Sequence, residues 1–91
     1  MLRAARQVSL ERLSFLLRQL QWYQHLLHEA NQFIMALDDF TDVLEDAGQG
    51  NQQLHAQLVG LRIQLVQYQN TCRMALVTTE QRIGRLCLRH P

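Results

Sequence analysis

The sequence predicts an all-α fold: an antiparallel two-helix hairpin of coiled-coil type that completes a three- or four-helix bundle with helices of partner chains. Apolar residues recur in alternating steps of three and four along two long segments, which is the pattern of a heptad repeat. A single strong break, residues 46–51 (DAGQGN), separates the segments. The chain has 91 residues, 47% of them hydrophobic, with one proline and four glycines. This length limits it to one small domain.

The first helix is predicted at about residues 9–47, with Ser9 as a possible cap and a start nearer residue 3 as the alternative. No glycine or proline interrupts this segment. Its apolar seam runs in steps of three and four from Leu13 onward, and Leu10 precedes it. The seam consists of Leu10, Leu13, Leu16, Leu20, Tyr23, Leu27, Ala30, Ile34, Leu37, Thr41 and Leu44.

The turn is predicted at about residues 48–51 and the second helix at about residues 52–89. Gly48 suits the left-handed position just past a helix end, and Asn51 is a good N-cap. Two successive steps of four around Cys72 predict a stutter, which locally unwinds a supercoil. The second seam consists of Leu54, Leu58, Leu61, Leu65, Tyr68, Cys72, Leu76, Thr79, Ile83 and Leu86. Residues 59–68 also alternate like a strand, but no turn residues bound them, so the helix is preferred.

The short turn makes the two helices antiparallel, and the whole chain, 1–91, forms one hairpin domain. The seams then come into register, with Leu37 facing Leu61 and Ala30 facing Tyr68, a small residue against a large one. Two alternatives remain. One is a continuous helix through the break that dimerises in parallel, and the other is a third helix formed by the chain ends.

Apolar side chains exceed what a two-helix seam requires, and they predict surfaces that bind partner helices. A simple coiled coil buries only a narrow stripe, whereas the apolar arc of the first helix is much wider. Gly60 lies beside the surplus stripe of the second helix, where another backbone can approach closely. The candidate partner-binding residues are Phe15, Trp22, Leu26, Phe33 and Phe40 on the first helix and Val59, Ile63, Val66, Met74 and Val77 on the second.

Charge is nearly balanced, at +1, but it is segregated along the hairpin. Arginines gather where the two chain ends meet, and Arg3, Arg6, Arg82, Arg85 and Arg89 are candidate contacts for an acidic partner. Acids gather at the turn: Asp38, Asp39, Asp42, Glu45 and Asp46. Acids at the C-terminal end of a helix oppose its dipole, and no local interaction in the sequence explains them.

Residues that would carry chemistry are missing from the seam positions. His25, His28 and Glu29 lie off the seam, and bundle metal sites need inward Glu and His residues from facing helices. Cys72 is a core position, and the sequence has no phosphate-binding loop or nucleophile elbow. We therefore expect no metal, no cofactor and no enzymatic activity. We also expect no specific nucleic-acid partner, because zinc-finger and RNA-binding signatures are missing.

The sequence has no apolar run long enough to span a membrane, so no transmembrane segment is expected. Cys72 and Cys87, about 22 Å apart along one helix, are too distant for a disulfide, which favours a reducing, cytoplasmic compartment. The basic, acid-free start, residues 1–8 (MLRAARQV), is the alternative signal of mitochondrial targeting.

These observations predict a non-enzymatic structural subunit of a multi-protein assembly that binds partner helices through its surplus apolar faces. The expected architecture resembles the small helical-hairpin subunits of cytoskeletal, centrosomal and kinetochore scaffolds, a likeness of architecture alone. Three alternatives stay open. The chain could dock acidic protein tails or anionic lipid through its arginine-rich end, assemble with itself into a bundle, or lie on a membrane surface through the apolar arc of residues 2–26.

Overall fold

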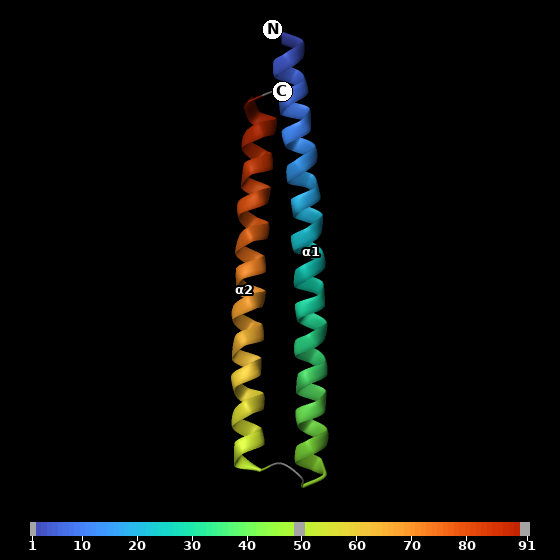
Figure 1. Ribbon diagram of the computed structural model, residues 1–91, viewed down its shortest axis with the longest axis vertical. Helices are drawn as coiled ribbons and strands as arrows, with labels where there is room; N and C mark the ends of the chain where they lie inside the picture. Colours follow the sequence, from blue (N-terminus) through green and yellow to red (C-terminus); the bar gives the residue numbers. More distant parts are fainter. Residues whose placement is uncertain (1, 49–50, 90–91) are drawn as a thin grey trace.

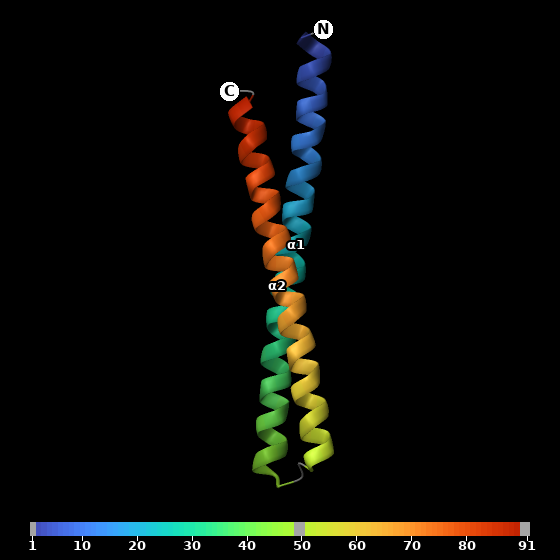
Figure 2. The ribbon, with the colours of Figure 1, turned by 90° about the vertical axis from the view of Figure 1, so that its left-hand side faces the viewer.

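The computed structural model is a rod of two long antiparallel helices, as Figures 1 and 2 show. It describes residues 2–48 and 51–89, with the side chains of residues 9–48 and 51–88. Helix α1 spans Leu2–Asp46 and helix α2 spans Gln52–Arg89. The rod measures 70 × 15 × 14 Å, and no strand occurs among the described residues. The predicted all-α helical hairpin is confirmed.

Helix α1 begins at Leu2, earlier than the predicted start near Ser9. Residues 2–8 contain leucine, arginine, alanine and glutamine, which are strong helix formers, and no glycine or proline ends the helix there. Figure 1 shows the resulting first turns of α1 extending beyond the end of α2.

The turn is shaped by the two residues singled out in the sequence. Gly48 has a φ of +66°, the left-handed conformation that glycine adopts without steric cost, and its N–H donates to the Glu45 carbonyl at 3.0 Å. The Asn51 side-chain oxygen accepts a hydrogen bond from the Leu54 N–H at 2.7 Å. This N-cap satisfies one of the free donors at the start of α2. Gln49 and Gly50, in the predicted turn, lie outside the described residues.

The seam of α1 lies where the heptad pattern places it. From Leu13 to Leu44 every predicted seam residue is buried or half-buried, and Leu16, Ala30, Ile34 and Leu37 are the most deeply buried. Leu10 is the exception at 66% exposed, because the two helices no longer cover each other so closely near their open end. Thr41 and Thr79 fit the seam because each hydroxyl donates to a carbonyl one turn earlier in its own helix, at 2.8 Å.

The seam of α2 departs from the prediction in its first half. Leu61 and Tyr68 are exposed, and Gln69 is half-buried in the place expected for Tyr68. The reason is a hydrogen bond from the Gln69 amide to Asn31, which holds this polar side chain at the interface. The seam then continues in steps of four and three without the stutter predicted at Cys72, through Leu65, Gln69, Cys72, Leu76, Thr79, Ile83 and Leu86.

Tyr68 lies at the edge of the seam rather than across from Ala30 as a core residue. Tyr68 keeps 45% of its surface exposed. Partial desolvation and then the neighbouring Cys72 thiol raise the pKa of its hydroxyl above 10.0. Cys72 and Cys87 are both free, the first buried and the second exposed.

Leu37→Ala should destabilise the hairpin strongly, because Leu37 is only 8% exposed and its loss leaves a cavity in the seam. We expect the free energy of unfolding to fall by about 2–5 kcal/mol in urea titrations followed by circular dichroism. Met35→Ala, two residues away and 66% exposed, is the control and should change it by about 0.5 kcal/mol or less. Equal losses in the two variants would contradict this packing.

Gly48→Ala and Gly84→Ala should have opposite effects on stability. Gly48 has positive φ, so alanine there is strained by about 1–2 kcal/mol and the melting temperature should fall. Gly84 lies within α2 with nothing within 4 Å of an added Cβ, so alanine should stabilise by about 0.5–1 kcal/mol. Thermal melts of both variants check this, and a fall in both would show that Gly84 requires glycine for another reason.

Candidate protein-interaction surfaces

One edge of the α1–α2 interface carries a polar ladder, which we define as Asn31, Asp38 and Glu45 of α1 with Gln69, Arg62 and His55 of α2. Gln69 donates to Asn31, Arg62 forms an ion pair with Asp38, and His55 lies 4.0 Å from Glu45. The ladder residues recur every seven positions in each helix. Because the helices are antiparallel, seven residues forward along α1 correspond to seven residues backward along α2. All three rungs of the ladder therefore belong to one register of the hairpin.

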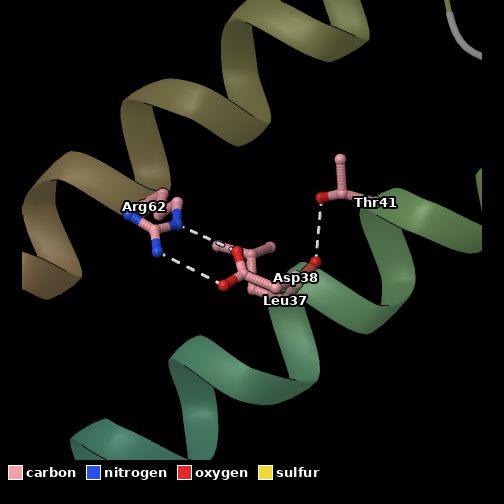
Figure 3. Close-up of polar contacts among 4 residues, drawn as sticks. All are labelled: Leu37, Asp38, Thr41 and Arg62. Carbon is pink, nitrogen blue, oxygen red and sulfur yellow. Dashed lines mark hydrogen bonds and ion pairs between the residues drawn. The ribbon is translucent and has the colours of Figure 1, made fainter. Parts of the chain in front are cut away.

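The Asp38–Arg62 pair is the best-formed rung of the ladder, and Figure 3 shows its geometry. Arg62 donates from Nε to Asp38 Oδ1 at 2.9 Å and from Nη2 to Oδ2 at 3.3 Å. Such bidentate pairing gives the ion pair a defined geometry in addition to charge attraction. The hydrogen bond from Arg62 holds the pKa of the Asp38 carboxyl below its ordinary value of 3.8. One acid at the turn, Asp38, is thus explained by a partner on α2 that sequence reasoning missed, and Glu45 Oε1 lies 4.0 Å from His55 Nδ1.

The opposite edge of the interface is apolar and carries an aromatic row, defined as Phe15, Trp22, Leu26, Phe33 and Phe40. Phe33 and Phe40 precede the seam residues Ile34 and Thr41, whereas the ladder residues follow their seam neighbours. The two rows therefore flank the seam on opposite sides. The four aromatic side chains are more than half exposed, with Phe33 at 61% and Trp22 at 57%, and only Leu26 is half-buried. His25 lies against Trp22, with ring centroids 5.8 Å apart.

A second apolar surface, the α2 stripe, comprises Val59, Ile63, Val66, Met74 and Val77. All except Val66 are exposed, and Met74 is the most open at 72%. Val66 is half-buried, next to the half-buried seam residue Leu65. Gly60 also lies exposed beside this stripe, and no atom would meet an added Cβ there within 4 Å.

The arginine-rich end contains an open groove lined by Arg12, Phe15, Leu16, Arg82, Arg85 and Leu86, hereafter the arginine groove. Arg82 and Arg85 were predicted as acidic-partner contacts, and the structure adds Arg12 from the facing helix. Within the part of the chain that the structure describes, none of the three forms a salt bridge. The side chains of Arg3, Arg6 and Arg89 lie outside the described residues. The groove therefore presents three unneutralised guanidinium groups beside an exposed phenyl ring.

Sequence reasoning missed other exposed apolar positions on α1. Val43 lies 64% exposed, one turn beyond Phe40, and Leu10, Leu17 and Met35 are also exposed. Val43 could have been predicted from the sequence. It continues the three–four spacing of the aromatic row, since it follows Phe40 by three residues as Phe15 follows Arg12. Seven-residue spacing of the ladder partners was likewise visible in the sequence, although only the register of the hairpin shows that they meet.

Neither a metal-ligand cluster nor a membrane span is formed by the described residues. No three of their His, Cys, Asp or Glu side chains come together as metal ligands would. Neither α1 nor α2, over its described length, contains a stretch apolar enough to cross a bilayer. Comparison with protein-family models, curated proteins and solved structures yields no match. The exposed faces are accordingly the basis for a functional proposal.

Asp38→Asn should reduce the loss of stability at acid pH. Because the folded-state pKa of Asp38 is lowered from 3.8, the pair stabilises the hairpin above that pH, and this contribution is lost as the pH falls through the folded-state pKa. Below about pH 4 the melting temperature of the wild type should therefore fall more steeply than that of the variant, as followed by circular dichroism.

Glu80→Gln is the matched control for this experiment. Glu80 lies on α2, is exposed, and forms no salt bridge within the described residues. Its variant should keep the pH dependence of the wild type. If the melting temperatures of both variants fell equally steeply with pH, the pair of Asp38 with Arg62 would not be the cause of the acid sensitivity.

Proposed function

We propose that the chain is a non-enzymatic structural subunit that binds other helical chains through its exposed apolar faces. The excess of exposed surface carries this proposal. The described chain exposes 7461 Å². A compact monomer of 10.7 kDa is expected to expose about 5,500 Å². The radius of gyration, 20.3 Å, likewise exceeds the roughly 12 Å of a compact domain of this length.

Energetics support association. Each large apolar side chain left in water forgoes roughly 1.5–3 kcal/mol. Only Leu16, Ala30, Ile34, Leu37 and Cys72 form the buried apolar core of the described hairpin, whereas the aromatic row and the α2 stripe remain in solvent. Monomeric proteins seldom keep contiguous apolar patches larger than a few hundred Å². Partner helices laid on these faces would complete a three- or four-helix bundle, as in helical scaffolds of multi-protein assemblies.

A reducing compartment such as the cytoplasm suits this role. Cys72 and Cys87 are free, and the thiol of Cys87 lies exposed on α2. An exposed thiol persists where glutathione and thioredoxin keep cysteines reduced.

The mass of the purified chain tests the proposal, measured by light scattering after size exclusion with circular dichroism on the same sample. We expect a helical oligomer, or a chain that folds poorly until a partner helix is supplied. The variant Phe33→Glu with Phe40→Glu should lose the oligomer and keep its helicity, because both residues lie off the seam.

Gln21→Glu with Gln24→Glu is the control, since it adds the same charge at exposed positions of α1 away from the aromatic row. It should associate like the wild type. A wild-type chain that is fully helical and monomeric at all concentrations would contradict the proposal.

The arginine groove favours a second candidate function, the docking of an acidic protein tail or anionic surface. Arg12, Arg82 and Arg85 come from both helices, and no acid neutralises them within the described residues. Three cations beside an apolar ring attract carboxylates over long range, and salt screens that attraction.

For this second candidate, a fluorescent poly-glutamate peptide is the probe and its anisotropy is the readout. We expect binding that weakens steeply with added salt and is abolished by Arg82→Gln with Arg85→Gln. Arg18→Gln with Arg73→Gln, at exposed positions outside the groove, should leave it nearly unchanged. Binding that ignores salt would contradict a charge-driven site.

A further inference from the structure

Helix α1 carries a second heptad seam that α2 does not cover. It runs through the aromatic row in alternating steps of three and four, at Arg12, Phe15, Gln19, Trp22, Leu26, Glu29, Phe33, Ala36, Phe40 and Val43. Every one of these positions except Gln19 and Leu26, which are half-buried, is exposed in the hairpin. A continuous seam of this kind is what one helix presents to a second helix in a coiled coil.

The residues of this second seam are arranged symmetrically about position 24. Residues equally distant from that position on either side are matched in kind: Trp22 with Leu26, Phe15 with Phe33, and the polar Gln19 with the polar Glu29. Position 24 is also the midpoint of α1, which spans Leu2–Asp46. An isologous contact about a two-fold axis requires such self-complementarity. When residue i of one copy meets residue j of the other, residue j of the first copy also meets residue i of the second.

We propose that a second copy of this chain occupies the aromatic row, with the two α1 helices antiparallel about a two-fold axis at position 24. Phe15 then lies against Phe33 of the second copy, and Trp22 lies against its Leu26. By the two-fold symmetry each of these contacts occurs twice in the dimer. Arg12 faces the small Ala36 of the second copy, which leaves room for the arginine stem. This inference rests on the proposed function, because it names the partner of one of the proposed apolar faces.

Charge selects the antiparallel arrangement. Arg12 comes close to Asp39 of the second copy, and the arginine groove approaches that copy's acidic turn. Glu11 lies near Asp39 of the second copy and opposes this attraction, but Arg12, Arg82 and Arg85 outnumber it. A parallel pair would instead place like charges together at both ends, which is unfavourable.

The area available is sufficient for a specific dimer. The four aromatic side chains of the row are exposed by 52–61%. A ring side chain can bury roughly 150–250 Å², so these residues alone supply about 700–1,100 Å² over both copies. Stable interfaces bury about 1,200–2,000 Å² in total, and the intervening seam residues contribute the remainder.

A neighbouring register, shifted by a single heptad, pairs Trp22 with Phe33 and Phe15 with Phe40. It is less favourable because it also places Leu26 against the charged Glu29 and Gln19 against Ala36. It also carries the two helices out of full overlap. The experiment can separate the two registers, because Gln19 has a different partner in each.

Disulfide trapping tests the dimer in the full chain with Cys87→Ser as background, leaving the buried Cys72 in place. Gln19→Cys and Glu29→Cys variants are mixed, oxidised and analysed by mass. We expect the 19–29 mixed disulfide to exceed one half of all disulfides, the fraction given by random pairing. The control mixes Gln21→Cys with His28→Cys, both exposed and away from the row, and should cross-link slowly.

The same samples are measured by light scattering, with an expected mass twice the 10.7 kDa of one chain. The charge-swapped chain Arg12→Asp with Asp39→Arg should dimerise more strongly than either single variant. Variant pairs that trap 19–19 and 29–29 disulfides would overturn the antiparallel dimer, as would a preferred disulfide between positions 19 and 36 when Ala36→Cys is used.

Failure of this inference can be told from failure of the proposed function. An oligomer that dissociates on Ile63→Glu with Met74→Glu, but not on Phe33→Glu with Phe40→Glu, would overturn the dimer through α1 and leave helix binding intact. A chain that is fully helical and monomeric at all concentrations would overturn both.

Discussion

A helix that packs against one neighbour buries only a narrow stripe of its surface, and this constraint governs the whole molecule. In the hairpin α1 and α2 cover each other's stripe. This contact buries the seam residues and little else. Because no third element exists in the described chain, most large apolar side chains off the seam stay in solvent. Fold and proposed function thus have the same cause: two helices close one seam and leave other faces open.

The two edges of the seam perform different tasks. On one edge the polar ladder, with the Asp38–Arg62 pair as its best-formed rung, sets how the helices slide relative to each other. Exposed ion pairs of this kind add little stability, but they penalise other registers, in which Asp38 would face Gln69 or His55 instead of Arg62. On the other edge the aromatic row supplies exposed apolar surface but does not specify the register of α1 against α2. Register is therefore specified on the side facing α2, and binding capacity is concentrated on the other side.

The position of Gln69 shows how one polar contact can override an apolar pattern. Leucine and tyrosine at positions 61 and 68 continue the heptad of α2 in the sequence, and both were expected in the core. The hydrogen bond of Gln69 with Asn31 and the ion pair of Arg62 with Asp38 rotate this half of α2, so the apolar pair lies at the rim. A tyrosine tolerates this position because its hydroxyl can remain in water.

The sequence by itself determined the two helices, the turn and nearly all of the α1 seam. These depend on local rules: heptad spacing, the left-handed glycine at 48 and the cap at Asn51. It also indicated most of the exposed apolar residues, because a single partner helix can cover only one stripe. Only the tertiary structure decided which residues of α2 enter the seam, that Asp38 and Glu45 have partners, and that Arg12 joins Arg82 and Arg85 in one groove. Those outcomes depend on the register between two helices, and a shift by one residue changes every cross-helix contact while leaving each helix, taken alone, the same.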